Sequence, residues 1–218
     1  VIRWQDANTR RTKTAAIPQS EIGTVQGWQR LQSYGLAVLS GRVKRERLSD
    51  YFQTQGSGDI YTITDRAGWH KDTYIMPSGE TITATDKDPA IIYNGDTSQA
   101  KAYQPNGELT DWQQNIARYA AGNSRLCLAL GASFAAPLLS LLNEESGGFH
   151  LMGDSSDGKT TAAKVALSVW GKPSGSLLSW SGTKIGFSNT AAARNDGLLV
   201  LDEIGQASPH VIGDTVYS

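Results

Sequence analysis

One segment in the last third of the chain predicts the architecture, and its sequence is Gly153-Asp154-Ser155-Ser156-Asp157-Gly158-Lys159-Thr160. It matches the pattern G-x-x-x-x-G-K-[ST] at every fixed position. Upstream, the apolar run over residues 149–152 predicts a short strand, and downstream, residues 159–170 predict a helix that ends before Gly171. Strand, glycine-rich loop and helix in this order are typical of a phosphate-binding loop. The sequence therefore predicts an α/β P-loop module.

The chemistry of such a loop assigns a role to each of its residues. The glycines let successive backbone N–H groups converge on phosphate oxygens, and the helix N-terminus adds partial positive charge. Lys159 is expected to reach the β- and γ-phosphates, and the Thr160 hydroxyl to ligate Mg²⁺. ATP and Mg²⁺ are therefore the predicted cofactors. The predicted nucleotide-binding residues are Gly153, Asp154, Ser155, Ser156, Asp157, Gly158, Lys159, Thr160 and Thr161.

A second element is the apolar run over residues 198–201, which two acids follow, Asp202 and Glu203. This pattern is typical of a buried parallel strand with polar groups at its carboxyl end, the edge where nucleotide sites lie. Asp202 is expected to hold Mg²⁺ through water, and Glu203 to polarise the attacking water. Alone, the pair also fits a solvated strand end, but the upstream loop favours the nucleotide site. The predicted catalytic residues are thus Lys159, Asp202 and Glu203, and the predicted metal ligands are Thr160 and Asp202.

Composition limits the class of protein. The chain has 218 residues, of which 39% are hydrophobic, enough to build a core. A single cysteine, Cys127, excludes an internal disulfide and fits a reducing cytoplasm. The apolar segment 126–142 is interrupted by glycine, serine and proline, so we expect a buried helix and no membrane span. The histidines and the cysteine lack metal-ligand spacing, so no metal other than Mg²⁺ is predicted.

Charge is distributed unevenly along the chain, although the net charge is only −1. Residues 1–47 carry nine Lys and Arg against three acids, and the remainder carries 11 against 18. A basic N-terminal region of this kind suits contact with the phosphate backbone of a nucleic acid. An ordinary solvated surface or a face between subunits explains it equally well.

The pattern of elements predicts three domains. Residues 1–108 form a mostly-β domain with a basic face, residues 109–145 a helical linker, and residues 146–218 the P-loop core. Strands are expected over residues 1–4, 60–64, 72–76, 81–83, 90–93, 149–152, 177–180 and 198–201. Helices are expected over residues 41–53, 111–121, from 124 to about 142, 159–170 and 185–194, with another starting near Ser208. Trp69 and His70 fit packing of a hairpin better than a platform for base stacking.

Several longer segments resemble a known family. They are the loop, residues 169–171, residues 179–183 and residues 195–206, together with residues 64–70 and 74–77 in the β-rich part. These segments resemble bacterial mobile-element ATPases catalogued as a domain of unknown function. That family includes cassette-chromosome helicases of the minichromosome-maintenance type, and the resemblance covers most of the chain.

The resemblance implies an AAA+-type ATPase that forms a homo-oligomeric ring in the bacterial cytoplasm. It would act on DNA through the ring pore and the basic N-terminal region, as the replicative helicase of a mobile element. An ATP-controlled initiator or loader that binds DNA without unwinding it is the alternative.

The sequence departs from the family in two places. Asp157 stands where a small residue is commoner, which places a carboxylate near the phosphates. The polar sensor residue, arginine finger and lid that the family places after the acidic strand are absent, so we expect an incomplete module and a truncated chain. Alone, such a chain would be nearly inactive as an ATPase.

Overall fold

The computed structural model describes residues 1–6, 9–56, 60–84, 90–181, 184–206 and 212. The chain forms two compact units. Unit 1 comprises Val1–Ile63 and Ala90–Ile92, and unit 2 comprises Thr64–Pro89 and Tyr93–Ser218. The predicted boundary at residue 108 does not coincide with this division. Residues 66–74 instead make hydrogen bonds to residues 195 and 196, far along the chain, and therefore belong to unit 2.

Unit 1 is built from a hairpin and two helices. Strands β1 (Ile2–Gln5) and β2 (Thr12–Ala15) pair antiparallel, with Ile2 opposite Ala15. After the short 3-10 turn η1 (Gln19–Glu21) come α1 (Val25–Ser33) and α2 (Arg42–Thr54). The core consists of Ile2, Ala15, Ile17, Trp28 and Leu31, against which Trp4, Ile22, Leu36, Val38, Leu48 and Phe52 pack.

Helix α1 was not expected from the sequence, while α2 lies within one residue of its prediction. The Thr24 side chain begins α1 by accepting a hydrogen bond of 3.0 Å from the amide of Gly27. Gly27 lies inside this helix because its backbone passes the carbonyl of Glu21 too closely for any side chain. Glycine weakens the helical pattern of a sequence, which is why the pattern alone gave no helix here.

Strand β3 (Thr62–Thr64) pairs with β7 (Ile91–Tyr93), close to the predicted ranges. Unit 2 then contains a three-stranded antiparallel sheet in the order β4-β5-β6. Its strands are β4 (Gly68–His70), β5 (Thr73–Ile75) and β6 (Thr81–Thr83). The predicted β5–β6 hairpin is confirmed, with Tyr74 opposite Ile82. Strand β4 was not expected.

The helices of unit 2 follow this sheet. They are η2 (Ala100–Tyr103), α3 (Leu109–Asn115), η3 (Ala117–Ala120), α4 (Ser124–Leu139), α5 (Lys159–Leu167), α6 (Pro173–Ser176) and α7 (Lys184–Ala192). The helix predicted over 111–121 is divided into α3 and η3, since Ile116 leaves the helical conformation. Helix α4 packs on α5, where the fully buried hydroxyl of Ser133 donates a 2.7 Å hydrogen bond to the carbonyl of Ala166.

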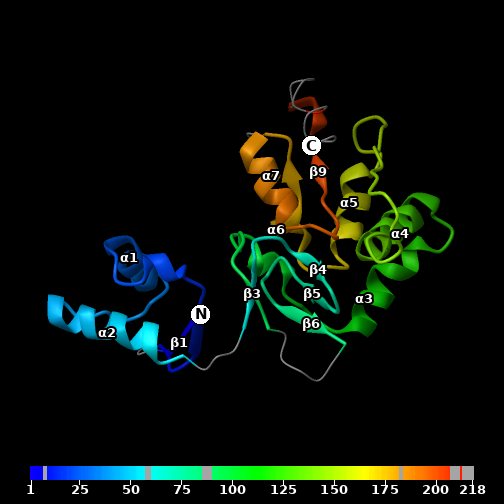
Figure 1. Cartoon of the computed structure of the whole chain (residues 1–218). Helices are drawn as coiled ribbons and strands as arrows, with labels where there is room; N and C mark the ends of the chain where they lie inside the picture. Colours follow the sequence, from blue (N-terminus) through cyan, green and yellow to red (C-terminus); the bar gives the residue numbers. More distant parts are fainter. Residues whose placement is uncertain (7–8, 57–59, 85–89, 182–183, 207–211, 213–218) are drawn as a thin grey trace. The chain divides into compact units, whose positions relative to one another are not determined.

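A short parallel pair completes unit 2. Strand β8 (Leu178–Ser179) lies beside β9 (Leu201–Asp202), and the 3-10 turn η4 (Ile204–Gln206) follows. In Figure 1, α7 lies on one side of this pair and α5 and α4 on the other. The helix predicted near Ser208 falls outside the described residues. Within those residues, no helix is both long and apolar enough to cross a membrane.

Candidate functional site

The predicted phosphate loop is a tight turn that leads directly into α5. Gly158, in the left-handed conformation with φ of 78°, is the residue immediately before the helix. Ser156 also has a positive φ, 71°, and Gly153 has φ of 155°. Alternating handedness of this kind turns successive backbone N–H groups toward one concave side, where an anion can bind. Ser155 and Ser156 lie exposed on this loop, and Thr161 lies exposed in the first turn of the helix.

The Lys159 side chain folds back onto the start of the loop. Its ammonium group donates a 2.8 Å hydrogen bond to the carbonyl oxygen of Gly153 and another to that of Asp154. The cation therefore lies within the concave side of the loop, where the sequence places the phosphates.

Asp157 occupies part of the same space. Its carboxylate accepts a 2.7 Å hydrogen bond from the backbone N–H of Asp154. The same carboxylate lies where a side chain on Gly153 would be, so position 153 has no room for one. An amide that could bind a phosphate oxygen is thus already bonded to an acid of the chain itself.

Thr160 and Asp202 meet across 42 residues of sequence. The Thr160 hydroxyl donates a 3.0 Å hydrogen bond to Oδ2 of Asp202. Pairing of β8 with β9 fixes the position of the acid, since Ser179 lies opposite Asp202 and the amide of Trp180 donates to its carbonyl at 3.2 Å. Hydroxyl and carboxylate oxygens are hard ligands, which suit Mg²⁺ held jointly with phosphate oxygens and water. The two predicted metal ligands are therefore close enough to act on one ion.

Glu203 follows at the end of β9 with a positive φ of 63°, and its amide donates to Oδ1 of Asp202 at 2.9 Å. A non-glycine residue in this conformation is uncommon, and it turns the chain sharply at the second acid. Asp202 is held toward the loop by its contact with Thr160.

The strand predicted over residues 149–152 is wrong. Phe149 is 67% exposed and Met152 81% exposed, and the segment pairs with no strand among the described residues. A strand needs a neighbour that accepts its backbone hydrogen bonds. Loop and helix are therefore present as predicted, but the strand before them is not.

Strand β9 is also shorter than predicted, because pairing begins only at Leu201. The turn before it, residues 194–197, is held instead by the β4–β5 hairpin. The backbone N–H of Trp69 donates to the Asp196 carboxylate at 2.9 Å, and the Tyr74 hydroxyl donates to the Asp196 carbonyl at 3.0 Å. Arg66 donates to the side-chain oxygen of Asn195 at 2.9 Å. The hairpin thus positions the segment that leads to the acids.

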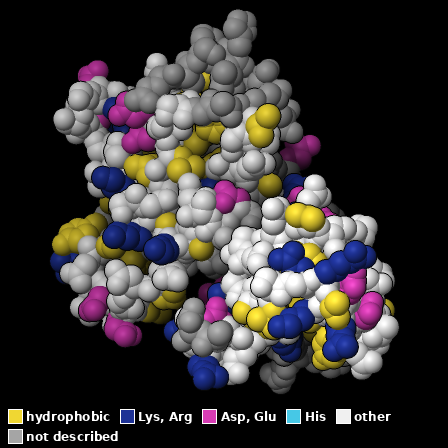
Figure 2. Space-filling view, turned by 90° about the vertical axis from the view of Figure 1, so that its left-hand side faces the viewer, with side chains coloured by type: hydrophobic (Ala, Val, Ile, Leu, Met, Phe, Trp, Pro, Cys, Tyr) yellow, Lys and Arg dark blue, Asp and Glu magenta, His cyan; other side chains and the backbone are white. Residues whose placement is uncertain are grey.

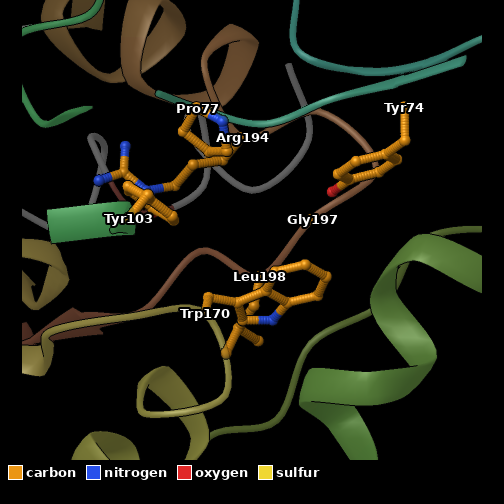
Figure 3. Close-up of a pocket in the computed structure, with 7 residues that line it drawn as sticks. All are labelled: Tyr74, Pro77, Tyr103, Trp170, Arg194, Gly197 and Leu198. Atoms are coloured by element: carbon orange, nitrogen blue, oxygen red, sulfur yellow. The ribbon is translucent and has the colours of Figure 1, made fainter. Parts of the chain in front are cut away.

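An aromatic cluster adjoins the turn at residues 194–197. The rings of Tyr74 and Trp170 stack with centroids 6.2 Å apart, and Arg194 lies 5.7 Å from the centre of the Tyr103 ring (Figure 3). Burial raises the pKa of the Tyr74 hydroxyl above its usual value, and the charge of Asp196 raises it further. The cavity that these residues line has a volume of about 10 Å³, space for roughly one water molecule. The cluster is therefore packing that supports the site.

Sequence reasoning missed this supporting layer. A 2.9 Å hydrogen bond from the amide of Gly197 to the carbonyl of Arg194 closes a turn at Asn195 and Asp196, and nothing in the sequence indicated which residues hold this turn. Trp69 packs in the hairpin as expected, with its ring nitrogen donating to the Pro137 carbonyl at 2.7 Å. The one local signal was Gly68, whose positive φ and close approach to Asn195 mark a contact between distant backbones.

The site therefore combines a loop of phosphate-binding pattern with a hydroxyl and an acid from two elements of a mixed α/β fold. The chain belongs to the family described as "Domain of unknown function (DUF927)", whose model matches residues 1–218. No match was found among curated proteins.

A solved structure described as "SCCmec type IV Cch - active helicase" is similar to this chain, with a TM-score of 0.67 and 21% identity. The match covers 92% of this chain but 40% of the other, so this chain spans less than half the length of that helicase. The mixed α/β fold therefore resembles part of a helicase. Family and fold agree with the resemblance to cassette-chromosome helicases seen in the sequence.

Proposed function

We propose that this chain binds Mg-ATP at the loop and is the nucleotide-binding part of an AAA+-type motor that acts on DNA. The observation that best supports this proposal is the 3.0 Å contact between Thr160 and Asp202. It joins the end of the phosphate loop to the acid of β9, two features that were each predicted from separate segments of the sequence. A chance match to the loop pattern gives no reason for such a contact.

Each of the site residues would have a separate role in the binding and hydrolysis of ATP. On binding, the Lys159 ammonium would exchange the carbonyls of Gly153 and Asp154 for β- and γ-phosphate oxygens. Thr160 and Asp202 would hold Mg²⁺, which neutralises charge that develops on the phosphates. Glu203 would orient the attacking water and accept its proton.

A DNA helicase of a mobile element is the activity we favour over an initiator or loader. The structural relative is described as an active helicase, and both its fold and the family match cover nearly the whole of this chain. We further propose that the motor is a homo-oligomeric ring, with DNA in its pore and against the basic N-terminal region.

Calorimetric titration with Mg-ATP tests the nucleotide site. Lys159→Ala removes the only side-chain cation of the loop, so we expect affinity to fall by at least about tenfold. Lys164→Ala is the matched control, because Lys164 is exposed in the last turn of the same helix, at the end away from the loop. Equal affinities for the two variants would refute the phosphate loop.

A further inference from the structure

Unit 1 contains a groove whose lining is basic and partly apolar. The groove has a volume of about 440 Å³ and lies between α2 and the loop before it, residues 37–39. Lys44, Arg45 and Arg47 contribute its charge, and Leu39 and Tyr51 its apolar surface. Figure 2, viewed from the side where α1 and α2 lie in Figure 1, shows Lys and Arg side chains gathered around hydrophobic ones. We propose that this groove binds a single strand of DNA.

The positive charge of the groove is not neutralised within the described part of the chain. Glu46 of α2 is bonded at 2.8 Å to Arg42, whereas Lys44, Arg45 and Arg47 form no ion pair with any described residue. No acid lines the groove. Unit 1 as a whole carries nine Lys and Arg against five acids, a net charge of +4. The groove is thus complementary to an anionic partner.

Arg45, which lines the groove, has an N–H group that lacks an acceptor within the ranges that the structure describes. Its Nε is buried and has no hydrogen-bond partner among the described residues. A buried donor without a partner destabilises the folded state, so a movement of the Arg45 side chain that lets a ligand accept from this N–H is favoured. Phosphate oxygens accept well from a guanidinium group.

Exposed apolar surface points to bases as well as phosphates. Tyr51 is 58% exposed and Leu39 64% exposed, although both line the groove. Leu48 and Val38 pack against the core of unit 1, which fixes the floor of the groove. Single-strand sites combine a cationic groove with aromatic side chains on which bases stack. In duplex DNA the base faces are covered by stacking and are not available to Tyr51. A protein reads a duplex by inserting a protruding helix or strand into a groove of the DNA, whereas this site is a groove in the protein.

This inference rests on the proposed action on DNA and specifies where and in which form DNA binds. It is tested with the whole 218-residue chain, without nucleotide, by fluorescence anisotropy of a labelled oligothymidylate of about 20 nucleotides. Lys44→Gln with Arg47→Gln should weaken binding by roughly tenfold or more. The slope of log affinity against log salt should fall by about 1.4, or about 0.7 for each phosphate that the protein no longer neutralises.

Arg10→Gln with Arg11→Gln is the matched control, since it removes the same charge from unit 1 outside the groove. We expect this control to change affinity by less than about threefold. Tyr51→Ala should weaken binding by roughly fivefold or more, as removal of a stacking ring does, while Tyr51→Phe keeps the ring and the affinity.

Three results would overturn the inference: equal reductions of affinity in the two double variants, a duplex bound as tightly as the single strand, or polyglutamate competing as well as the oligonucleotide. The last result would indicate an acidic protein partner. Calorimetry with Mg-ATP on the same variants separates the two proposals. Failure of the groove with intact ATP binding refutes only this inference, and failure of ATP binding with intact strand binding refutes only the nucleotide site.

Discussion

Asp157 places a carboxylate inside the loop that is proposed to bind phosphate. Its carboxylate accepts from the backbone N–H of Asp154 and so occupies one of the groups that would bind phosphate. The same carboxylate places a negative charge where the nucleotide brings several more. Binding would therefore require Asp157 to leave its position, at a cost in affinity. The contact also orders the loop, which favours a preformed site.

We expect the repulsion between Asp157 and the phosphates to affect affinity more than the ordering of the loop does. Charge–charge repulsion inside the loop outweighs one hydrogen bond to an exposed amide. Asp157→Ser should raise Mg-ATP affinity by roughly fivefold, about 1 kcal/mol. Asp154→Asn is the control, because it removes the same charge from the loop while its backbone still bonds Lys159. Calorimetry measures both. A fall in affinity for Asp157→Ser would mean that ordering of the loop is what this residue contributes.

At the scale of elements, the contact between the β4–β5 hairpin and the turn before β9 holds the site in place. Gly68 permits it, because a Cβ at this position would overlap the carbonyl oxygen of Asn195. The φ of 89° at Gly68 adds a backbone conformation that other residues rarely adopt. Any side chain would therefore push the hairpin away from Asp196.

Gly68→Ala should lower the free energy of unfolding by roughly 2–4 kcal/mol, the sum of backbone strain and overlap. Gly107→Ala separates the two contributions, since Gly107 has a similar φ of 85° but open space around it. We expect a decrease of only about 1 kcal/mol there. Urea denaturation followed by circular dichroism measures both variants. Equal decreases would mean that the close approach contributes nothing to stability.

Elements that follow from local pattern were predicted well. Helix α5, the β5–β6 hairpin and the strand β7 each carry their signal within a few residues: an apolar period, a turn with proline and glycine, or a run of β-branched side chains. The strand over 149–152 failed because an apolar run does not say whether a neighbouring strand exists. The hairpin's contact with Asp196 could not be predicted, since it joins residues 127 positions apart. The meeting of Thr160 and Asp202 was expected only because both segments matched parts of one known site.

At the scale of the whole molecule, the two units carry separate cores and separate proposed sites. The core of unit 1 surrounds Trp28 and Leu31, whereas one cluster of unit 2 surrounds Tyr74 and Tyr103. We therefore expect two thermal transitions, each sensitive to its own ligand. A ligand at about 100 times its dissociation constant stabilises the state it binds by about 2.7 kcal/mol.

Differential scanning calorimetry can assign these transitions. Mg-ATP should raise the melting temperature of unit 2, which has about 150 residues, by roughly 5–10 °C and leave the transition of unit 1 in place. Oligothymidylate should raise the melting temperature of unit 1 and leave that of unit 2 unchanged. Lys159→Ala should abolish only the shift that Mg-ATP causes in unit 2. Shifts of both transitions by either ligand alone would mean that the two sites are energetically coupled, because each ligand would then stabilise the unit that it does not contact.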